Sequence, residues 1–84
     1  MMLEIKLYAD NLKQSILDLP YRDGISDTDM ILIPESDYGF AEIYRMYDDI
    51  LVFLIPTYGG MPSFYRSYAR HSIDALISDL KTMT

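Results

Sequence analysis

Hydrophobic residues gather in three short runs in the middle of the chain. MILIP at 30–34 is rich in β-branched and aliphatic residues, FAEIYRMY at 40–47 mixes aromatic and polar residues, and ILVFLIP at 50–56 is continuously apolar. Such runs are typical of β-strands, and an unbroken one is typical of a strand buried on both faces. Asp48 and Asp49 separate the last two runs and predict a tight hairpin turn. The pattern therefore predicts an antiparallel meander with 50–56 as its central strand.

The C-terminal third predicts a helix. The loop TYGGMP at 57–62 contains two glycines and a proline, so it predicts a chain reversal. The segment 64–69 fits either a last strand or the start of a helix. Ser72 is a candidate N-cap for a helix over 73–83. One apolar stripe of that helix consists of Ile73, Leu76, Ile77 and Leu80.

The N-terminal segment carries two conflicting periodicities. Leu3, Ile5 and Leu7 alternate with polar residues as in a strand, whereas Ile5, Tyr8, Leu12, Ile16 and Leu19 are spaced as on one helix face. The sequence leaves residues 2–8 undecided between strand and helix. It predicts a helix over about 10–18, with Asp10 as the N-cap and Pro20 beyond its end.

Length and composition bound the fold class. The 84 residues are enough for one domain over 1–84, and half of them are hydrophobic, which favours a folded chain. The elements predict an α+β fold, with a meander sheet of three to four strands packed by the C-terminal helix and an N-terminal helix. The chain has no cysteine, no signal-like N-terminal run and no apolar run long enough to span a bilayer. We therefore expect a cytoplasmic protein that does not bind membranes.

Charge is unevenly distributed. The chain has a net charge of −6; residues 1–49 hold eleven acids and four basic residues, whereas residues 50–84 hold two acids and three basic residues. An acidic field repels phosphate groups and steers association toward basic surfaces. We therefore do not expect direct binding to nucleic acid. We expect a basic protein partner instead.

Known chemical motifs do not fit the chain. Counted from Asp23, the glycine position of a calcium-binding EF-hand loop is Thr28 and the last ligand position is Pro34, so that pattern fails. His71 is the single histidine and no cysteine accompanies it, so it is interpreted as a surface residue at a helix boundary. The sequence predicts no metal, no cofactor and no enzyme activity.

Acids and tyrosines together form the candidate binding surface. Tyrosine offers large contact area with few rotatable bonds, and acids steer and pair with a basic partner. The candidate partner-binding residues are Tyr21, Asp23, Asp27, Asp29, Glu35, Asp37, Tyr38, Asp48, Asp49 and Tyr58. If 27–29 and 35–37 are extended, each acid pair lies about 6.8 Å apart on one face, which is similar to the spacing of phosphates along a nucleic acid strand. The alternative is an acidic edge that only keeps the sheet soluble.

The remaining tyrosines and arginines have structural interpretations. Tyr8, Tyr44 and Tyr68 are expected in the core, whereas Tyr21, Tyr38 and Tyr58 are expected to be exposed. Arg66 and Arg70 are expected to pair with acids of the same chain rather than to bind nucleic acid.

In size, charge and composition, the chain is similar to small inhibitors encoded by phages and mobile elements, among them anti-CRISPR proteins and DNA mimics. This resemblance implies a non-enzymatic protein that blocks a nucleic-acid-handling complex by occupying its basic surface. Two alternatives stay open: an immunity or antitoxin partner of a toxin, and a self-assembling structural protein whose homodimer uses 50–56 and the tyrosines.

Overall fold

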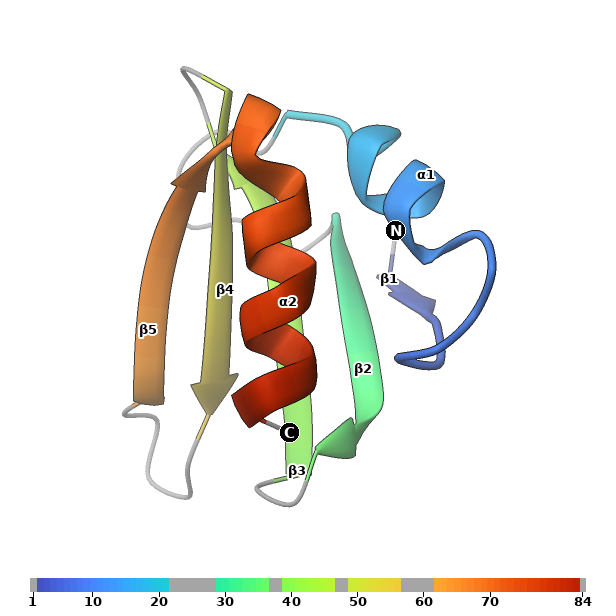
Figure 1. The fold of residues 1–84 in the computed structure, drawn as a ribbon, viewed down its shortest axis with the longest axis vertical. Helices are drawn as coiled ribbons and strands as arrows, with labels where there is room; N and C mark the ends of the chain where they lie inside the picture. The colour runs from blue at the N-terminus through green and yellow to red at the C-terminus, as the bar shows by residue number, and fades with distance from the viewer. Residues whose placement is uncertain (1, 22–28, 37–38, 47–48, 57–61, 84) are drawn as a thin grey trace.

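The computed structural model describes residues 2–21, 29–36, 39–46, 49–56 and 62–83. Their elements, in chain order, are strand β1 (Met2–Glu4), helix α1 (Leu12–Leu17), strands β2 (Met30–Ser36), β3 (Gly39–Met46), β4 (Ile50–Pro56) and β5 (Pro62–Ala69), the 3₁₀ turn η2 (Arg70–Ser72) and helix α2 (Ile73–Met83) (Figure 1). The α+β class predicted from the sequence is confirmed.

The sheet has five strands in the order β1-β2-β3-β4-β5. Strand β1 runs parallel to β2, and every later pair is antiparallel. The predicted antiparallel sheet of three to four strands is therefore wrong in its strand number and in one pairing. A parallel neighbour needs a crossover connection, and the stretch with α1 between β1 and β2 supplies it.

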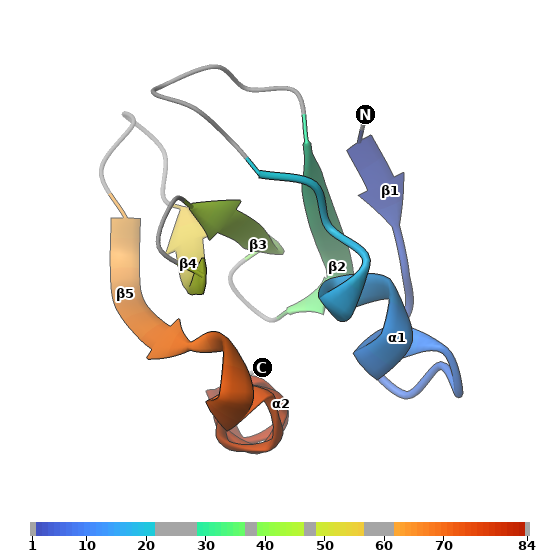
Figure 2. The ribbon, with the colours of Figure 1, turned by 90° about the horizontal axis from the view of Figure 1, so that it is seen from above.

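The two helices lie on one side of the curved sheet (Figure 2). Paired residues of adjacent strands share a face, so the pairs Ile31↔Ile43 and Ile43↔Phe53 align one apolar row under the helices. The predicted stripe of α2 faces this row, because Ile73, Leu76 and Leu80 are buried and Ile77 is partly buried. The core thus forms between one sheet face and both helices.

Strand β4 is an interior strand of the sheet, as expected for the continuously apolar run at 50–56. It pairs with β3 on one side and β5 on the other. Phe53 and Ile55 are buried on the helix-covered face, and Val52, on the opposite face, is only 7% exposed. The unbroken apolar run is thereby explained, since both faces of the strand are shielded.

The structure tests the turns, the strand and the helix start that were predicted from short sequence patterns. The predicted hairpin between the strands before and after the two acids is confirmed by the antiparallel pair Met46↔Ile50; Asp48 lies outside the described residues, and Asp49 has a positive φ of 56°, a conformation that Asp tolerates better than most residues. Residues 64–69 are strand, within β5. The expected N-cap at Asp10 is wrong: α1 starts at Leu12 after Asn11, which makes no side-chain capping bond.

Candidate functional site

The structure describes three of the ten predicted partner-binding side chains, those of Tyr21, Asp29 and Asp49. Glu35 lies in β2, near the end of that strand. The other six lie outside the described residues: Asp23, Asp27, Asp37, Tyr38, Asp48 and Tyr58. The structure thus fixes where the flanking elements lie and leaves the site assignment a prediction.

The predicted acids divide between the two ends of β2. Asp29 immediately precedes the strand and Glu35 is its penultimate residue. Six residues of extended chain span about 20 Å. Asp49 belongs to the same end of the sheet as Asp29, because antiparallel β3 ends where β2 begins. The candidate acids that the structure places along the chain, Asp29, Glu35 and Asp49, therefore lie at two ends of the sheet rather than in one contiguous row.

Tyr21, Arg45 and Asp49 form a network at the first of these ends. The Tyr21 hydroxyl donates to Asp49 Oδ1 at 2.8 Å, and Arg45 Nη2 donates to the same oxygen at 2.5 Å. The Arg45 guanidinium also stacks on the Tyr21 ring, 3.8 Å from its centroid. The hydrogen bonds from Arg45 and Tyr21 lower the pKa of Asp49, so its carboxylate stays ionised and internally engaged.

Two arginines join this network to the end of α1. Arg45 Nη1 donates to the Leu19 carbonyl at 3.3 Å, and Arg70 Nη2 donates to the Leu17 carbonyl. Leu17 is the last residue of α1 and Leu19 lies two residues beyond it, so neither carbonyl has a partner within the helix and cationic donors stabilise both. Arg70 also lies 3.9 Å from Asp49 Oδ1. The cluster therefore holds α1, the β3–β4 hairpin and the end of β5 together, a role that sequence reasoning missed.

Tyr21 remains accessible despite its network. Its residue is 53% exposed and the Asp49 side chain is 56% exposed. The exposure predicted for Tyr21 is confirmed. Both residues thus combine a structural role with a surface that a partner can reach.

A second network lies between β5 and α2. Arg66 Nη1 donates to Asp79 Oδ2 at 2.8 Å, and the Tyr68 hydroxyl donates to the same oxygen at 2.6 Å. These bonds lower the pKa of Asp79, while burial and the neighbouring carboxylate raise the pKa of Tyr68 to about 12. As expected, Arg66 and Arg70 each pair with an acid of the same chain, Arg66 with Asp79 and Arg70 with Asp49.

The other tyrosines give a mixed outcome. Tyr44 and Tyr68 are each 8% exposed, as predicted, but Tyr8 is 69% exposed and that expectation is wrong. Tyr8 lies in the turn closed by the bond from the Ala9 amide to the Lys6 carbonyl, before α1 begins, so helix spacing does not place it in the core. Its ring lies 5.1 Å from Lys81 Nζ instead.

Four cations are engaged in ion pairs within the part of the chain that the structure describes. Lys13, Arg45, Arg66 and Arg70 pair with the carboxylates of Asp49, Asp74 and Asp79. Over its full length the chain carries thirteen acids against seven lysines and arginines, a net charge of −6. The negative charge that the chain presents to solvent is therefore not cancelled by these internal pairs.

Within the part of the chain that the structure describes, no three His, Asp or Glu side chains are grouped so that they could hold a metal ion. His71 is exposed in η2, at the helix boundary where it was expected. Neither described helix has the length and apolar character needed to cross a membrane. Comparison of the chain with models of known families, with characterised proteins and with solved structures gives no significant match.

Proposed function

We propose that this protein is a non-enzymatic cytoplasmic inhibitor that binds a basic surface of a nucleic-acid-handling complex. The observation that carries the proposal is the net charge of −6 and its distribution, because residues 1–49 hold eleven acids and only four basic residues. Such a charge raises the association rate with basic grooves and opposes binding to phosphate.

The spacing of the acids supports a partner that normally follows a nucleic acid backbone. Asp29 immediately precedes β2 and Glu35 is its penultimate residue, and the strand is irregular between Ile33 and Ser36, so the two positions are at most about 20 Å apart. Phosphates on one DNA strand advance by about 3.4 Å along the helix axis, so this distance corresponds to roughly six base pairs. Acids at the two ends of β2 can therefore occupy cation sites that contact separated phosphates, while Tyr21 supplies an exposed aromatic contact beside them.

The test starts from a captured partner and asks whether the protein displaces nucleic acid from it. Tagged protein is incubated with lysate at low salt, bound proteins are identified by mass spectrometry, and the purified partner is loaded with fluorescent DNA or RNA. We expect the inhibitor to displace the nucleic acid and its affinity to fall steeply as salt rises.

Two variants with the same charge change locate the interface. Asp27→Asn, Glu35→Gln and Asp37→Asn together should weaken displacement by at least about tenfold. The control combines Asp10→Asn, Asp18→Asn and Asp74→Asn, which are exposed and are not among the candidate residues; it should retain most of the activity. Equal losses in both variants, or a partner that binds without regard to salt and without releasing nucleic acid, would contradict the proposal.

A further inference from the structure

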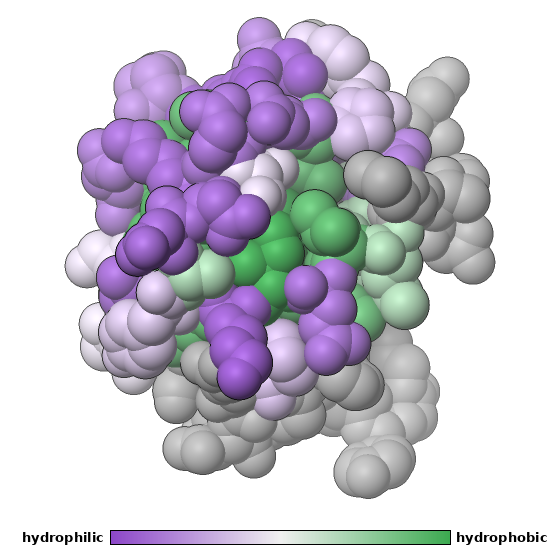
Figure 3. Space-filling model, turned by 90° about the vertical axis from the view of Figure 1, so that its right-hand side faces the viewer, coloured by the Kyte–Doolittle hydropathy of each residue, from purple (hydrophilic) through white to green (hydrophobic). Residues whose placement is uncertain are grey.

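Exposed apolar side chains gather along the outer edge of β1. Met2 is 62% exposed, Leu3 is 39% exposed and Tyr8, just beyond the strand, is 69% exposed. On the side of the molecule where β1 lies, an apolar patch is surrounded by hydrophilic residues (Figure 3). The other exposed large hydrophobic residues of the described chain, Tyr21 and Tyr65, lie on separate elements.

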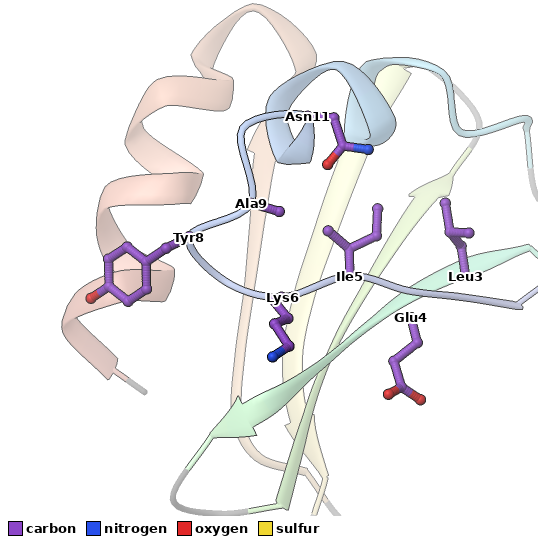
Figure 4. Close-up of a pocket in the computed structure, with 7 residues that line it drawn as sticks. All are labelled: Leu3, Glu4, Ile5, Lys6, Tyr8, Ala9 and Asn11. Atoms are coloured by element: carbon purple, nitrogen blue, oxygen red, sulfur yellow. The ribbon is translucent and has the colours of Figure 1, made fainter.

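An open groove runs beside this edge, between β1 and the segment that leads into α1. Its volume is about 490 Å³, and Leu3, Ile5 and Ala9 contribute apolar walls. Leu3 and Ile5 point to one side of the chain, whereas Glu4 and Lys6 point to the other (Figure 4). The edge therefore combines an apolar side with a side that carries one negative and one positive charge.

The backbone of the edge is available for pairing. The Ile5 amide donates to the Leu32 carbonyl at 3.0 Å, so Ile5 faces β2. Alternate residues of a strand direct their amide and carbonyl to opposite neighbours, so the amide and carbonyl of Glu4 and the amide of Lys6 point outward. The Lys6 carbonyl already accepts from the Ala9 amide at 3.0 Å, although a carbonyl has a second lone pair. No described strand pairs with this outer edge, and such an edge is a template for another strand.

We propose that a second copy of this chain occupies the edge, with two β1 segments paired antiparallel about a two-fold axis at Ile5. In that register Glu4 of each copy lies opposite Lys6 of the other, which gives two opposite-charge cross-strand pairs. A two-fold axis at Glu4 would instead set Glu4 against Glu4. The charge pattern of the edge is thus complementary to itself in one antiparallel register.

The same register brings the exposed end of β1 next to a turn of the partner copy. Beyond Lys6 the chain leaves the strand direction in the turn closed by the bond from the Ala9 amide to the Lys6 carbonyl, so the ladder between the copies ends at the Glu4–Lys6 pairs. Met2 and Leu3 of each copy then continue past Lys6 toward the partner's turn, which carries the exposed Tyr8. The two sheets continue as one.

Charge reversal at the edge tests the register. Sedimentation equilibrium over about 5 to 500 μM protein should give a dimer that dissociates on dilution. Glu4→Lys makes the net charge less negative, which by itself would favour association, yet it should weaken the dimer at least about tenfold because Lys6 then meets a like charge. Lys6→Glu should also weaken it, and the double variant should restore it.

Asp18→Lys is the control, because it changes the net charge by the same amount as Glu4→Lys on an exposed residue after α1. It should leave the dimer intact or tighten it. Circular dichroism should show that all four variants keep the fold. A monomer at every concentration, a dimer that Glu4→Lys does not weaken, or a double variant that stays monomeric would overturn the proposal.

Salt separates this proposal from the inhibitor function. Each copy carries a net charge of −6, so screening their mutual repulsion should tighten the dimer by about tenfold between 0.01 M and 0.15 M salt. Binding to a basic partner should weaken over the same range. The salt dependence of dimerisation and the salt dependence of partner binding are separate measurements. Failure of one proposal therefore does not affect the test of the other.

Discussion

Replacing Tyr68 by Phe tests the contact between β5 and α2 with a single oxygen atom. The Tyr68 residue is 8% exposed, and its hydroxyl donates to the Asp79 carboxylate at 2.6 Å. Phe keeps the ring and its packing, so the substitution isolates the hydroxyl. At neutral pH the variant should lose about 1 kcal/mol of stability, less than a fully buried bond to a charged group because water reaches Asp79.

The stabilising effect of the hydroxyl should be lost at alkaline pH. The pKa of Tyr68 is raised from its ordinary value of 10 to about 12 in the folded state, chiefly by burial and then by Asp79. A raised pKa means that the folded state holds the proton more tightly, so its stabilisation is complete below pH 10 and is lost as pH rises toward 12. A two-unit shift corresponds to at most about 2.7 kcal/mol, and solvent around Arg66 and Asp79 reduces our expectation to about 1 to 2 kcal/mol.

Urea unfolding monitored by circular dichroism measures this difference. The free energy of unfolding of wild type and Tyr68→Phe should differ by a constant amount up to about pH 10 and converge above it. The control Tyr65→Phe removes the same group from a 59% exposed ring on the opposite face of β5, and should cost less than about 0.5 kcal/mol at neutral pH. If the difference in free energy of unfolding between wild type and Tyr68→Phe stays constant from pH 9 to 11.5, the reasoning is refuted.

Two further substitutions compare the core with the surface. Phe53→Ala removes a fully buried ring from the central strand and should destabilise the fold by about 3 to 5 kcal/mol in urea unfolding; a loss below about 1 kcal/mol would show that the ring does not pack as described. Lys13→Ala breaks the 3.0 Å ion pair with Asp74 that links the two helices, but the side chains are 52% and 82% exposed, so thermal unfolding should register less than about 0.5 kcal/mol. A larger loss would mean that this pair orders the helix interface.

Elements defined by local pattern were predictable from the sequence. The helix over 73–83 has an uninterrupted apolar stripe, and α2 has the same bounds. The run at 50–56 and the two acids before it gave the central strand and its hairpin. In these segments neighbouring residues supply the interactions that decide the structure, so their order alone carries the information.

Elements that depend on distant partners were not predictable. The alternation at Leu3 and Ile5 was present, but only pairing with Ile31 on β2 favours strand over helix there. The arginine cluster is similar: Arg45 meets Leu19, 26 residues earlier, and Arg70 meets Leu17, 53 residues earlier. Within this cluster, only the Arg45–Asp49 pair joins residues that are close in the sequence, four positions apart.

The position of α2 after all five strands also affects synthesis of the chain on the ribosome. Ile31, Ile43 and Phe53 are made well before Leu76 and Leu80, the side chains of α2 that shield that sheet face. At typical rates of translation, the stretch from Ile55 to Leu80 takes about one to five seconds to make. Until α2 has been made and has packed, that apolar face lacks the cover of α2, so chaperones and proteases can act on the part of the chain that has emerged.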